Sequence, residues 1–309
     1  MKKINNAYIS GLGAIGGAYG SILYNSNSKS VKVIADPERI ARYTKNGITV
    51  NGKRYDFDYV KPSEPDVPAD LILVAVKGHH LNEAIKNIKP FVGGHTVIMS
   101  LLNGITSEET LAHAFGREKI LYAFCVGTDA VREGTEIKYG NPGKIVFGDR
   151  YSRDSENVKA VKAFFDKARF PYTVPEDIVR ELWWKFMMNV GINQTSAVLR
   201  APYGVYHRIT EAKELMYSAS REVLPIAKME GINLDENDIR NYLDIIGTLS
   251  PEGKTSMLQD VEAGRKTEVE SFALTVIDLG KKHGIPTPIN EVLYRMIRII
   301  EQTYSDHPK

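Results

Sequence analysis

The first half of the chain alternates short apolar runs with longer amphipathic stretches. The run Asp70–Val76 is almost continuously apolar, as expected of a strand that is buried on both faces of a parallel sheet. Segments with a helical period separate this run from others of its kind, and the alternation predicts βαβ units in a doubly wound sheet. The predicted strands are Ala7–Ser10, Val31–Asp36, Asp70–Val76, Thr96–Leu102, Ile120–Val126 and Tyr172–Val174, and the predicted helices of this half include one that ends near Tyr24 and one over 157–168.

Turn signals predict two hairpins. The dipeptide Asn51-Gly52 is typical of a two-residue hairpin turn and lies between the strand-like runs Ile48–Val50 and Lys53–Tyr55. The segment 136–149 is predicted to form a second hairpin, which turns at Asn141–Gly143.

The pattern changes after residue 174. From Pro175 on, the chain shows helical patterns of roughly ten to twenty-five residues and few strand-like runs. We therefore expect an α/β fold class with a Rossmann-type doubly wound sheet in an N-terminal domain, residues 1–174. An all-α C-terminal domain, residues 175–309, would follow it.

Composition bounds the cellular location. Cys125 is the only cysteine, so no intramolecular disulfide can form, which fits a reducing compartment. The sequence has no run of eighteen apolar residues and no apolar signal-peptide region near its N-terminus. We expect a cytoplasmic protein that does not associate with a membrane.

Charge is unevenly distributed between the two halves. Residues 1–174 hold 24 Lys and Arg against 18 Asp and Glu, whereas residues 175–309 hold 16 against 20. The basic half would attract a small polyanion. Dense basic runs with interleaved aromatic residues are missing, so nucleic-acid binding is not expected. The neighbours His79 and His80 would not face one point on a helix, and no cluster has the spacing of metal ligands, so no metal site is expected.

Three glycines follow the first predicted strand. Gly11, Gly13 and Gly16 have the spacing G-x-G-x-x-G and open the first predicted helix. One glycine permits a tight turn, one lets the backbone approach a pyrophosphate, and one allows close packing of helix and strand. The pattern predicts a dinucleotide site at the helix N-terminus, and the plain alternative is a glycine turn that only packs. The expected coenzyme-binding residues of this loop are Gly11, Leu12, Gly13, Ala14, Ile15 and Gly16.

Asp36 bears on which coenzyme is bound. It follows Gly16 by twenty residues and ends the second predicted strand. A carboxylate at this point accepts hydrogen bonds from a ribose 2′-hydroxyl and repels a 2′-phosphate, which favours NAD(H). Arg39 and Arg42 follow closely, and either could pair with a 2′-phosphate or stack on adenine, so NADP(H) stays open. Asp36 could also simply cap a helix that begins at Pro37.

A helical stripe in the second half carries unusual polar residues. Lys185, Asn189 and Asn193 are spaced four apart within an apolar run, which places them on one face of a helix. A lysine in such surroundings must meet a partner, shift its pKa or face a cavity. The alternative is that Lys185 extends to the surface and the amides bond to nearby backbone.

Two further polar side chains are expected at the carboxyl ends of strands. Lys77 follows the run Asp70–Val76, and Asn103 follows the run Thr96–Leu102. In an open α/β sheet these ends line the ligand crevice.

Glu268 has two interpretations. Thr267 and Glu270 have the composition and spacing of a capping box, which would place Glu268 at the first position of a helix. The helix dipole favours a carboxylate there, so capping is a sufficient explanation. The functional interpretation is that Glu268 meets Lys185 in a cleft between the two domains.

Together these stretches resemble the 2-dehydropantoate 2-reductase (ketopantoate reductase) family. The likeness covers nearly the whole chain, in family order. The matching stretches are Gly11–Gly16, Ala75–Lys77, Leu102–Gly104, Trp184-Lys185 with Asn189 and Asn193, Ser256–Asp260, Lys266–Glu268 and His283–Pro288.

The resemblance implies NADPH-dependent reduction of ketopantoate to D-pantoate, a step of pantothenate and coenzyme A biosynthesis. It implies a Rossmann-type domain, an all-helical domain and a site between them. In this family pattern Lys185 is the catalytic lysine, Glu268 is its partner acid, and Lys77 lies near the coenzyme. The positions implied to contact the substrate are Asn103, which also reaches the coenzyme, Asn189, Asn193 and Ser256.

Two positions depart from the family pattern and bear on the alternatives. Asp36-Pro37 stands where the family often carries a basic residue, and Tyr203 stands where it can carry an asparagine. An NAD-dependent D-2-hydroxy acid dehydrogenase acting on another branched 2-oxo acid would suit both. A non-catalytic dinucleotide sensor would have no use for Lys185 with Glu268. The apolar helices after residue 210 could bury a subunit interface, so a homodimer is a possible assembly.

Overall fold

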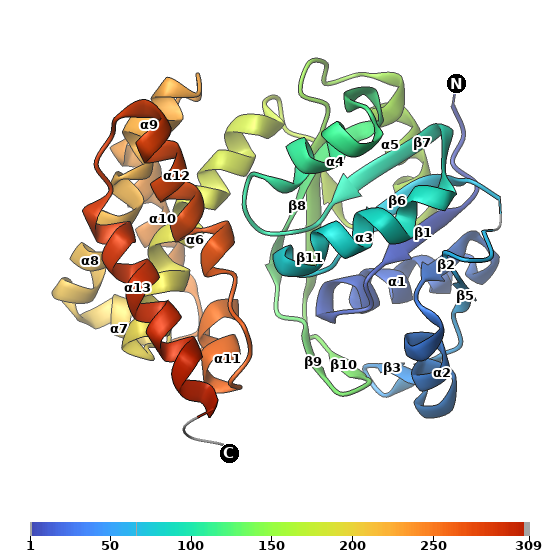
Figure 1. Ribbon diagram of the computed structural model, residues 1–309, viewed down its shortest axis with the longest axis horizontal. Helices are drawn as coiled ribbons and strands as arrows, with labels where there is room; N and C mark the ends of the chain where they lie inside the picture. Colours follow the sequence, from blue (N-terminus) through green and yellow to red (C-terminus); the bar gives the residue numbers. More distant parts are fainter. Residues whose placement is uncertain (1, 66, 306–309) are drawn as a thin grey trace. The chain divides into compact units, whose positions relative to one another are not determined.

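The computed structural model describes residues 2–65 and 67–305, which form two compact units (Figure 1). Unit 1 takes in the chain up to Leu102 and then Thr106–Ile178. Unit 2 takes in the described residues from Val179 to 305 and, in addition, the short segment Asn103–Ile105. The second unit therefore receives three residues from the middle of the first half of the chain.

An eight-stranded sheet forms the centre of unit 1. Its strands are β1 (Ala7–Ser10), β2 (Val31–Ile34), β5 (Asp58–Val60), β6 (Ala69–Val74), β7 (Val92–Ser100), β8 (Ile120–Thr128), β11 (Pro142–Gly148) and β12 (Tyr172–Thr173). Their order is β12-β11-β8-β7-β6-β1-β2-β5, and only the β8–β11 pairing in this sheet is antiparallel. The chain runs from β1 outward through β2 to β5 and then returns to β6. In such sheets ligands bind beyond the carboxyl ends of the strands where the order reverses, which here are β1 and β6.

Helices cover both faces of this sheet because successive strand side chains point to opposite sides. Ile9 and Leu71 belong to a buried cluster with residues of α1 (Ala14–Ser26) and α5 (Glu156–Ala168). Their neighbours Tyr8 and Ile72 belong to another cluster with residues of α3 (Leu81–Ile88) and α4 (Ser107–Phe115), which lie over the other face (Figure 1). Cys125 is a buried member of the first cluster. The predicted doubly wound α/β class is confirmed.

A second, four-stranded sheet carries the first predicted hairpin. Its strands are β3 (Ile48–Val50), β4 (Lys53–Tyr55), β9 (Val131–Glu133) and β10 (Glu136–Lys138), and α2 (Pro37–Asn46) precedes them. β3 and β4 pair antiparallel around Asn51 and Gly52, whose φ angles are 48° and 77°. Positive φ at both central residues is the requirement of the hairpin turn that Asn-Gly favours.

The prediction of a second hairpin over residues 136–149 is wrong. β10 and β11 do not pair with each other: β10 pairs with β3 and β9 in the small sheet, whereas β11 pairs with β8 and β12 in the large one. The turn at Asn141–Gly143 therefore carries the chain from one sheet to the other. Turn residues alone do not specify which strands they connect.

Unit 2 is helical. Its helices are α6 (Ile178–Leu199), α7 (Tyr203–Arg208), α8 (Thr210–Arg221), α9 (Val223–Met229), α10 (Glu236–Thr248), α11 (Ser256–Glu262), α12 (Ala273–His283) and α13 (Pro288–Gln302). α6 begins with the last residue of unit 1, and its side chains Phe186, Met187 and Met188 are buried. Within the described residues, no helix is both long and apolar enough to cross a membrane.

Candidate functional site

The glycine loop joins β1 to α1, and two of its glycines are required by the chain's own packing. Gly11 has a φ of +100°, which strains any residue with a side chain, and a Cβ there would lie 2.8 Å from the Ala75 carbonyl oxygen. A Cβ on Gly16 would lie 1.9 Å from the Gly11 carbonyl oxygen. These two glycines allow the turn and the close approach of α1 to the loop after β6.

Gly13 is different because the protein itself leaves room for a side chain there. A Cβ on Gly13 would meet only the Ala75 carbonyl oxygen, at an ordinary contact distance of 3.8 Å. Gly13 precedes Ala14 and Ile15, the first residues of α1, whose first turn has no acidic side chain. The N–H groups of a first helical turn have no partner within the helix. An N-terminus of this kind, beside a glycine that packing does not require, fits the pyrophosphate of a dinucleotide.

Arg132 of β9 adds a cation that the sequence pattern did not indicate. Its guanidinium donates to the carbonyl oxygen of Leu12, the buried second residue of the glycine loop, and to that of Gly134. The same group lies over the ring of Tyr43 on α2, 5.6 Å from its centroid. Arg132 is 120 residues from Leu12 in the chain, so only the tertiary fold reveals this contact.

Asp36 caps α2, as the plain interpretation predicted. Its Oδ1 accepts a hydrogen bond of 2.7 Å from the backbone N–H of Arg39, and Pro37 is the first helical residue. The Arg39 guanidinium lies 3.3 Å from the other Asp36 oxygen and 3.3 Å from a carboxylate oxygen of Glu83 on α3. Arg42 lies over the ring of Tyr43. The cation nearest Asp36 is thus held between two carboxylates.

Lys77 lies where its strand predicts. It follows β6 directly, is half-buried, and precedes a 3-10 turn, Gly78–His80, that leads into α3. Lys77 therefore lies close in sequence to Ala75, whose carbonyl oxygen faces Gly11 and Gly13. His79 and His80 are exposed.

The polar stripe of unit 2 lies on α6, which spans all three of its residues. Lys185 and Asn189 are half-buried, and Asn193 is 5% exposed. The Lys185 ammonium donates a hydrogen bond of 3.0 Å to Oδ1 of Asn103. Lys185 thus has a protein partner rather than extending only into solvent.

Asn103 links Lys185 to Glu268. Its Oδ1 accepts from Lys185, and its Nδ2 donates to Oε2 of Glu268 at 2.9 Å. The Glu268 residue is only 6% exposed. A buried carboxylate is costly unless it is hydrogen-bonded and near a cation, and the amide supplies the hydrogen bond while connecting the two charges.

The backbone around Asn103 explains why this amide lies in unit 2. Gly104 has a φ of +99°, and a Cβ there would approach the carbonyl oxygen of Ser271 to 3.2 Å. Ser271 ends a 3-10 turn, Val269–Ser271, that follows Glu268. The glycine therefore lets the loop lie against the same turn that carries the acid.

The capping box expected at Thr267 and Glu270 is not formed. Glu268 precedes a 3-10 turn rather than starting an α-helix. Thr267 does accept a hydrogen bond of 3.3 Å from the N–H of Val269, but the Glu270 side chain pairs with Lys266 and Arg298 instead of reaching back. The box fails because the cations near Glu270 compete for its carboxylate.

Ser256 and Asn193 are joined indirectly. Ser256 is the exposed first residue of α11, and Thr255 before it caps that helix. The Thr255 hydroxyl is hydrogen-bonded to Ser196, whose hydroxyl donates to the Asn193 carbonyl oxygen at 3.2 Å. The start of α11 is thereby fixed to the part of α6 that carries Asn193.

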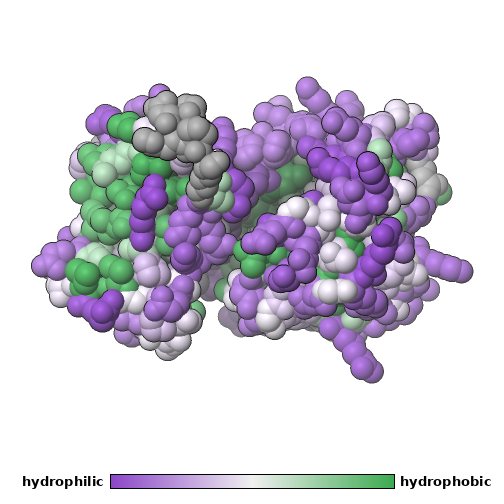
Figure 2. Space-filling view, turned by 90° about the horizontal axis from the view of Figure 1, so that it is seen from below, coloured by the Kyte–Doolittle hydropathy of each residue, from purple (hydrophilic) through white to green (hydrophobic). Residues whose placement is uncertain are grey.

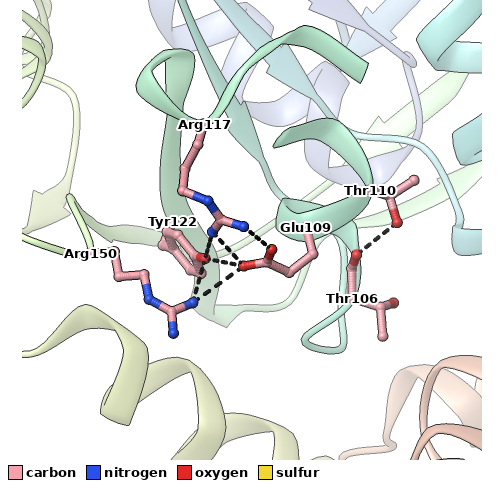
Figure 3. Close-up of polar contacts among 6 residues, drawn as sticks. All are labelled: Thr106, Glu109, Thr110, Arg117, Tyr122 and Arg150. Carbon is pink, nitrogen blue, oxygen red and sulfur yellow. Dashed lines mark hydrogen bonds and ion pairs between the residues drawn. The ribbon is translucent and has the colours of Figure 1, made fainter. Parts of the chain in front are cut away.

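A separate polar cluster lies in unit 1 and joins α4 to β8 (Figure 3). Glu109 accepts hydrogen bonds from Arg117 and Tyr122, and Arg150 approaches the same carboxylate to 3.3 Å. The hydrogen bond from Arg117 is the main cause that lowers the pKa of Glu109 to about 2. Burial is the main cause that raises the pKa of Tyr122. Ion pairs that link segments in this way stabilise a fold, so we assign the cluster to structure.

No group of three or more His, Cys, Asp or Glu side chains among residues 2–65 and 67–305 is arranged to hold a metal ion.

Comparison with known proteins decides the family. Residues 7–151 match the family profile "Ketopantoate reductase PanE/ApbA", and residues 177–301 match "Ketopantoate reductase PanE/ApbA C terminal". The chain belongs to the ketopantoate reductase family. As a member of this family it is an oxidoreductase.

Relatives of this ketopantoate reductase family member match it over almost their full length. The 2-dehydropantoate 2-reductase of Aquifex aeolicus is 28% identical, over 95% of this chain and 96% of its own. The solved structure of 2-dehydropantoate 2-reductase from Geobacter metallireducens is 26% identical with a TM-score of 0.83, covering 94% of this chain and 99% of that one. A ternary structure of D-mandelate dehydrogenase with NADH and anilino(oxo)acetate is 21% identical with a TM-score of 0.87, covering 97% and 99%, and shares the fold.

Proposed function

We propose that this member of the ketopantoate reductase family reduces ketopantoate to D-pantoate with a nicotinamide coenzyme. The observation that carries the proposal is the connected set Lys185, Asn103 and Glu268, in which one amide accepts from an ammonium and donates to a buried carboxylate. The name of the Aquifex aeolicus relative supports the same substrate. In the cell this reaction would serve pantothenate biosynthesis.

The chemistry requires neutralisation of charge at a carbonyl oxygen. A bound nicotinamide coenzyme would supply the hydride, and the glycine loop with Gly11, Gly13 and Gly16 would hold its pyrophosphate. Negative charge then develops on the substrate carbonyl oxygen, and the Lys185 ammonium would stabilise it and donate the proton. Asn103 directs that ammonium, because its Oδ1 accepts one of the three N–H bonds.

The remaining site residues would bind the substrate. In this proposal Glu268 holds a substrate hydroxyl while its other oxygen keeps the Asn103 amide. Asn189, Asn193 and Ser256 would receive the carboxylate and hydroxyl ends. Lys77 would lie near the coenzyme, beyond the end of β6.

We infer that the coenzyme is NAD(H) rather than the NADP(H) suggested by the resemblance. Asp36 and Glu83 hold Arg39 between them, each at 3.3 Å. The cation nearest Asp36 is therefore already paired with two carboxylates, which disfavours a 2′-phosphate and leaves Asp36 able to accept from a ribose hydroxyl.

The ratio of catalytic efficiencies with NADH and NADPH tests this choice. We expect NADH to be preferred, and Glu83→Gln should raise kcat/KM with NADPH about two- to fivefold because it removes one exposed charge partner of Arg39. Glu64→Gln, which removes an exposed acid paired with Lys61 at 3.2 Å, is the matched control and should leave the ratio unchanged. A wild-type preference for NADPH would overturn the inference.

A second candidate is an NAD-dependent D-2-hydroxy acid dehydrogenase acting on a larger apolar 2-oxo acid. Trp184, beside Lys185 on α6, packs edge-on against Tyr242 at 5.9 Å, and Tyr203 belongs to the same cluster of unit 2 as Tyr242. Burial raises the pKa of Tyr203, so its phenol stays neutral. Aromatic residues near the lysine helix favour an apolar substrate side chain, and the D-mandelate dehydrogenase likeness agrees.

A steady-state panel separates these functions. Ketopantoate, phenylglyoxylate and aliphatic branched 2-oxo acids are each assayed with NADH and with NADPH. The highest kcat/KM with ketopantoate supports the first proposal, and the highest value with phenylglyoxylate supports the second. Coenzyme binding without turnover of any acid would point to a dinucleotide sensor instead.

The assembly and location stay predictions. α13 carries an exposed apolar stripe, Val292, Met296 and Ile299, and Figure 2 shows apolar side chains gathered on the face of unit 2 seen there. A second copy of the chain that buried this stripe would explain why apolar side chains are exposed there. Light scattering would then report the mass of a dimer. The cytoplasmic location would be checked by fractionation.

A further inference from the structure

We propose that Glu301, in the last turn of α13, is a positioning residue for Glu268. This role rests on the proposed function, because Glu301 acts only through the acid whose carboxylate receives the Asn103 amide. Glu301 itself is assigned no contact with substrate or coenzyme.

Glu301 fixes the residue that precedes Glu268. One carboxylate oxygen, Oε1, accepts hydrogen bonds from the backbone N–H of Thr267 at 2.8 Å and from the Thr267 hydroxyl at 2.7 Å. The same hydroxyl accepts from the backbone N–H of Val269 at 3.3 Å. The backbone is therefore held on both sides of Glu268, by Glu301 directly at Thr267 and through the Thr267 hydroxyl at Val269.

The position of Glu301 is unfavourable without those contacts. The Glu301 side chain is 8% exposed, and it lies at the negative end of the α13 dipole, where the last turn has no basic residue. Burial and the dipole both oppose a carboxylate there. Arg298 offsets part of this cost by donating to Oε2 at 2.6 Å, and the two Thr267 bonds account for the other oxygen.

The contacts form one continuous path to the ammonium. Glu301 holds Thr267, Thr267 is bonded covalently to Glu268, Glu268 accepts from Asn103, and Asn103 accepts from Lys185. Arg298 of α13 also pairs with Glu270 and so fastens the same loop to α13, while Lys266 pairs with Glu270 within the loop. Loss of Glu301 should let the Glu268 carboxylate move away from the amide, and small displacements of this kind are costly in catalysis.

A double-mutant cycle tests the role. Glu301→Ala should lower kcat/KM for the best acid roughly tenfold to a hundredfold while leaving the Kd for NADH within about twofold. In a Glu268→Ala background the same change should cost nothing further, because the residue through which it acts is gone. Glu301→Gln retains an acceptor oxygen and should recover most of the kcat/KM that Glu301→Ala loses. Thr267→Ser retains the hydroxyl and should keep a higher kcat/KM than Thr267→Val, which does not.

The matched control is Glu291→Ala on the same helix. Glu291 is an acid paired with an arginine of α13 at 3.0 Å, as Glu301 is paired with Arg298, but it lies in the first turn of the helix, whereas Glu301 lies in the last. Equal losses for Glu291→Ala and Glu301→Ala, or additive losses in the Glu268→Ala background, would overturn this inference alone. A folded wild-type protein with no turnover on any acid would overturn the proposed function and this role together.

Discussion

Three glycines in one loop differ in what each would meet if it gained a methyl group. At Gly11 and Gly16 a Cβ would lie within 3 Å of backbone atoms of the protein, whereas at Gly13 it would meet none nearer than 3.8 Å. The three glycines are therefore required for different physical reasons. Packing explains the first two, and the third is where we propose that the coenzyme approaches the backbone.

Gly13→Ala should leave the fold intact and weaken coenzyme binding. Loss of a good N-terminal cap residue costs about 1 kcal/mol of stability at most. A steric cost of about 1.4 kcal/mol at the pyrophosphate would raise the Kd for NADH roughly tenfold, measured by fluorescence titration. Gly16→Ala is the contrasting variant and should lower the free energy of unfolding by about 3 kcal/mol. Normal NADH affinity in folded Gly13→Ala would remove the coenzyme from this loop.

Lys185→Ala should lower kcat by roughly a hundredfold to ten-thousandfold if its ammonium is the general acid. The Kd for NADH should change little, because the proposed coenzyme loop belongs to unit 1. Lys228→Ala, at an exposed position of α9, is the control and should be neutral. Near-normal turnover in purified Lys185→Ala would show that another group supplies the proton.

At the scale of the element, local patterns predict most of the strands and the Asn51-Gly52 hairpin, because period and turn chemistry are properties of neighbouring residues. They do not predict the three-residue strands β5 and β9, which are too short to show a period. They failed for the turn at 141–143, because pairing partners in two different sheets are not a local property. The lysine stripe of α6 was visible in the sequence. The hydrogen bonds from Lys185 to Asn103 and from Asn103 to Glu268 span 82 and 165 residues, so no local pattern could predict that the amide bridges the two charges.

The Glu109 cluster should make the free energy of unfolding depend on pH in the acid range. The folded pKa of about 2 lies below the ordinary value of 4.5, so the stabilisation is fully present above pH 4.5 and is lost as pH falls toward 2. The side chain is 46% exposed, and solvent screening limits the effect to about 1 kcal/mol. Urea unfolding of Glu109→Gln and wild type should therefore differ at pH 7 and converge near pH 2. A constant difference across that range would contradict the assignment.

At the scale of the whole molecule, charge is divided along the chain. Residues 1–174 carry a net charge of +6 and residues 175–309 one of −4. The positive part includes the glycine loop, so its field should draw in a dinucleotide, whose phosphates are anionic. This long-range attraction differs from the local effect that we propose for Asp36 and Glu83, which would favour NADH over NADPH.

Raising the ionic strength from about 0.05 M to about 0.5 M should weaken NADH binding several-fold, since salt screens attraction over distances beyond a few ångströms. NADPH carries an additional phosphate, so its Kd should rise more steeply. The melting temperature in the same buffers is the control for global effects of salt. An NADH affinity independent of salt would mean that only short-range contacts hold the coenzyme.

The three-residue excursion Asn103–Ile105 limits how this protein can be divided. A fragment that starts at Val179 would keep the ammonium of Lys185 and the carboxylate of Glu268 but would lack the amide that bridges them. During synthesis Asn103 leaves the ribosome 165 residues before Glu268 does, so the bridge can close only after all of the chain between them has been made. A gene fusion that exchanged the helical half at this junction would therefore pair a new lysine and acid with an amide encoded far upstream, in the half that was kept.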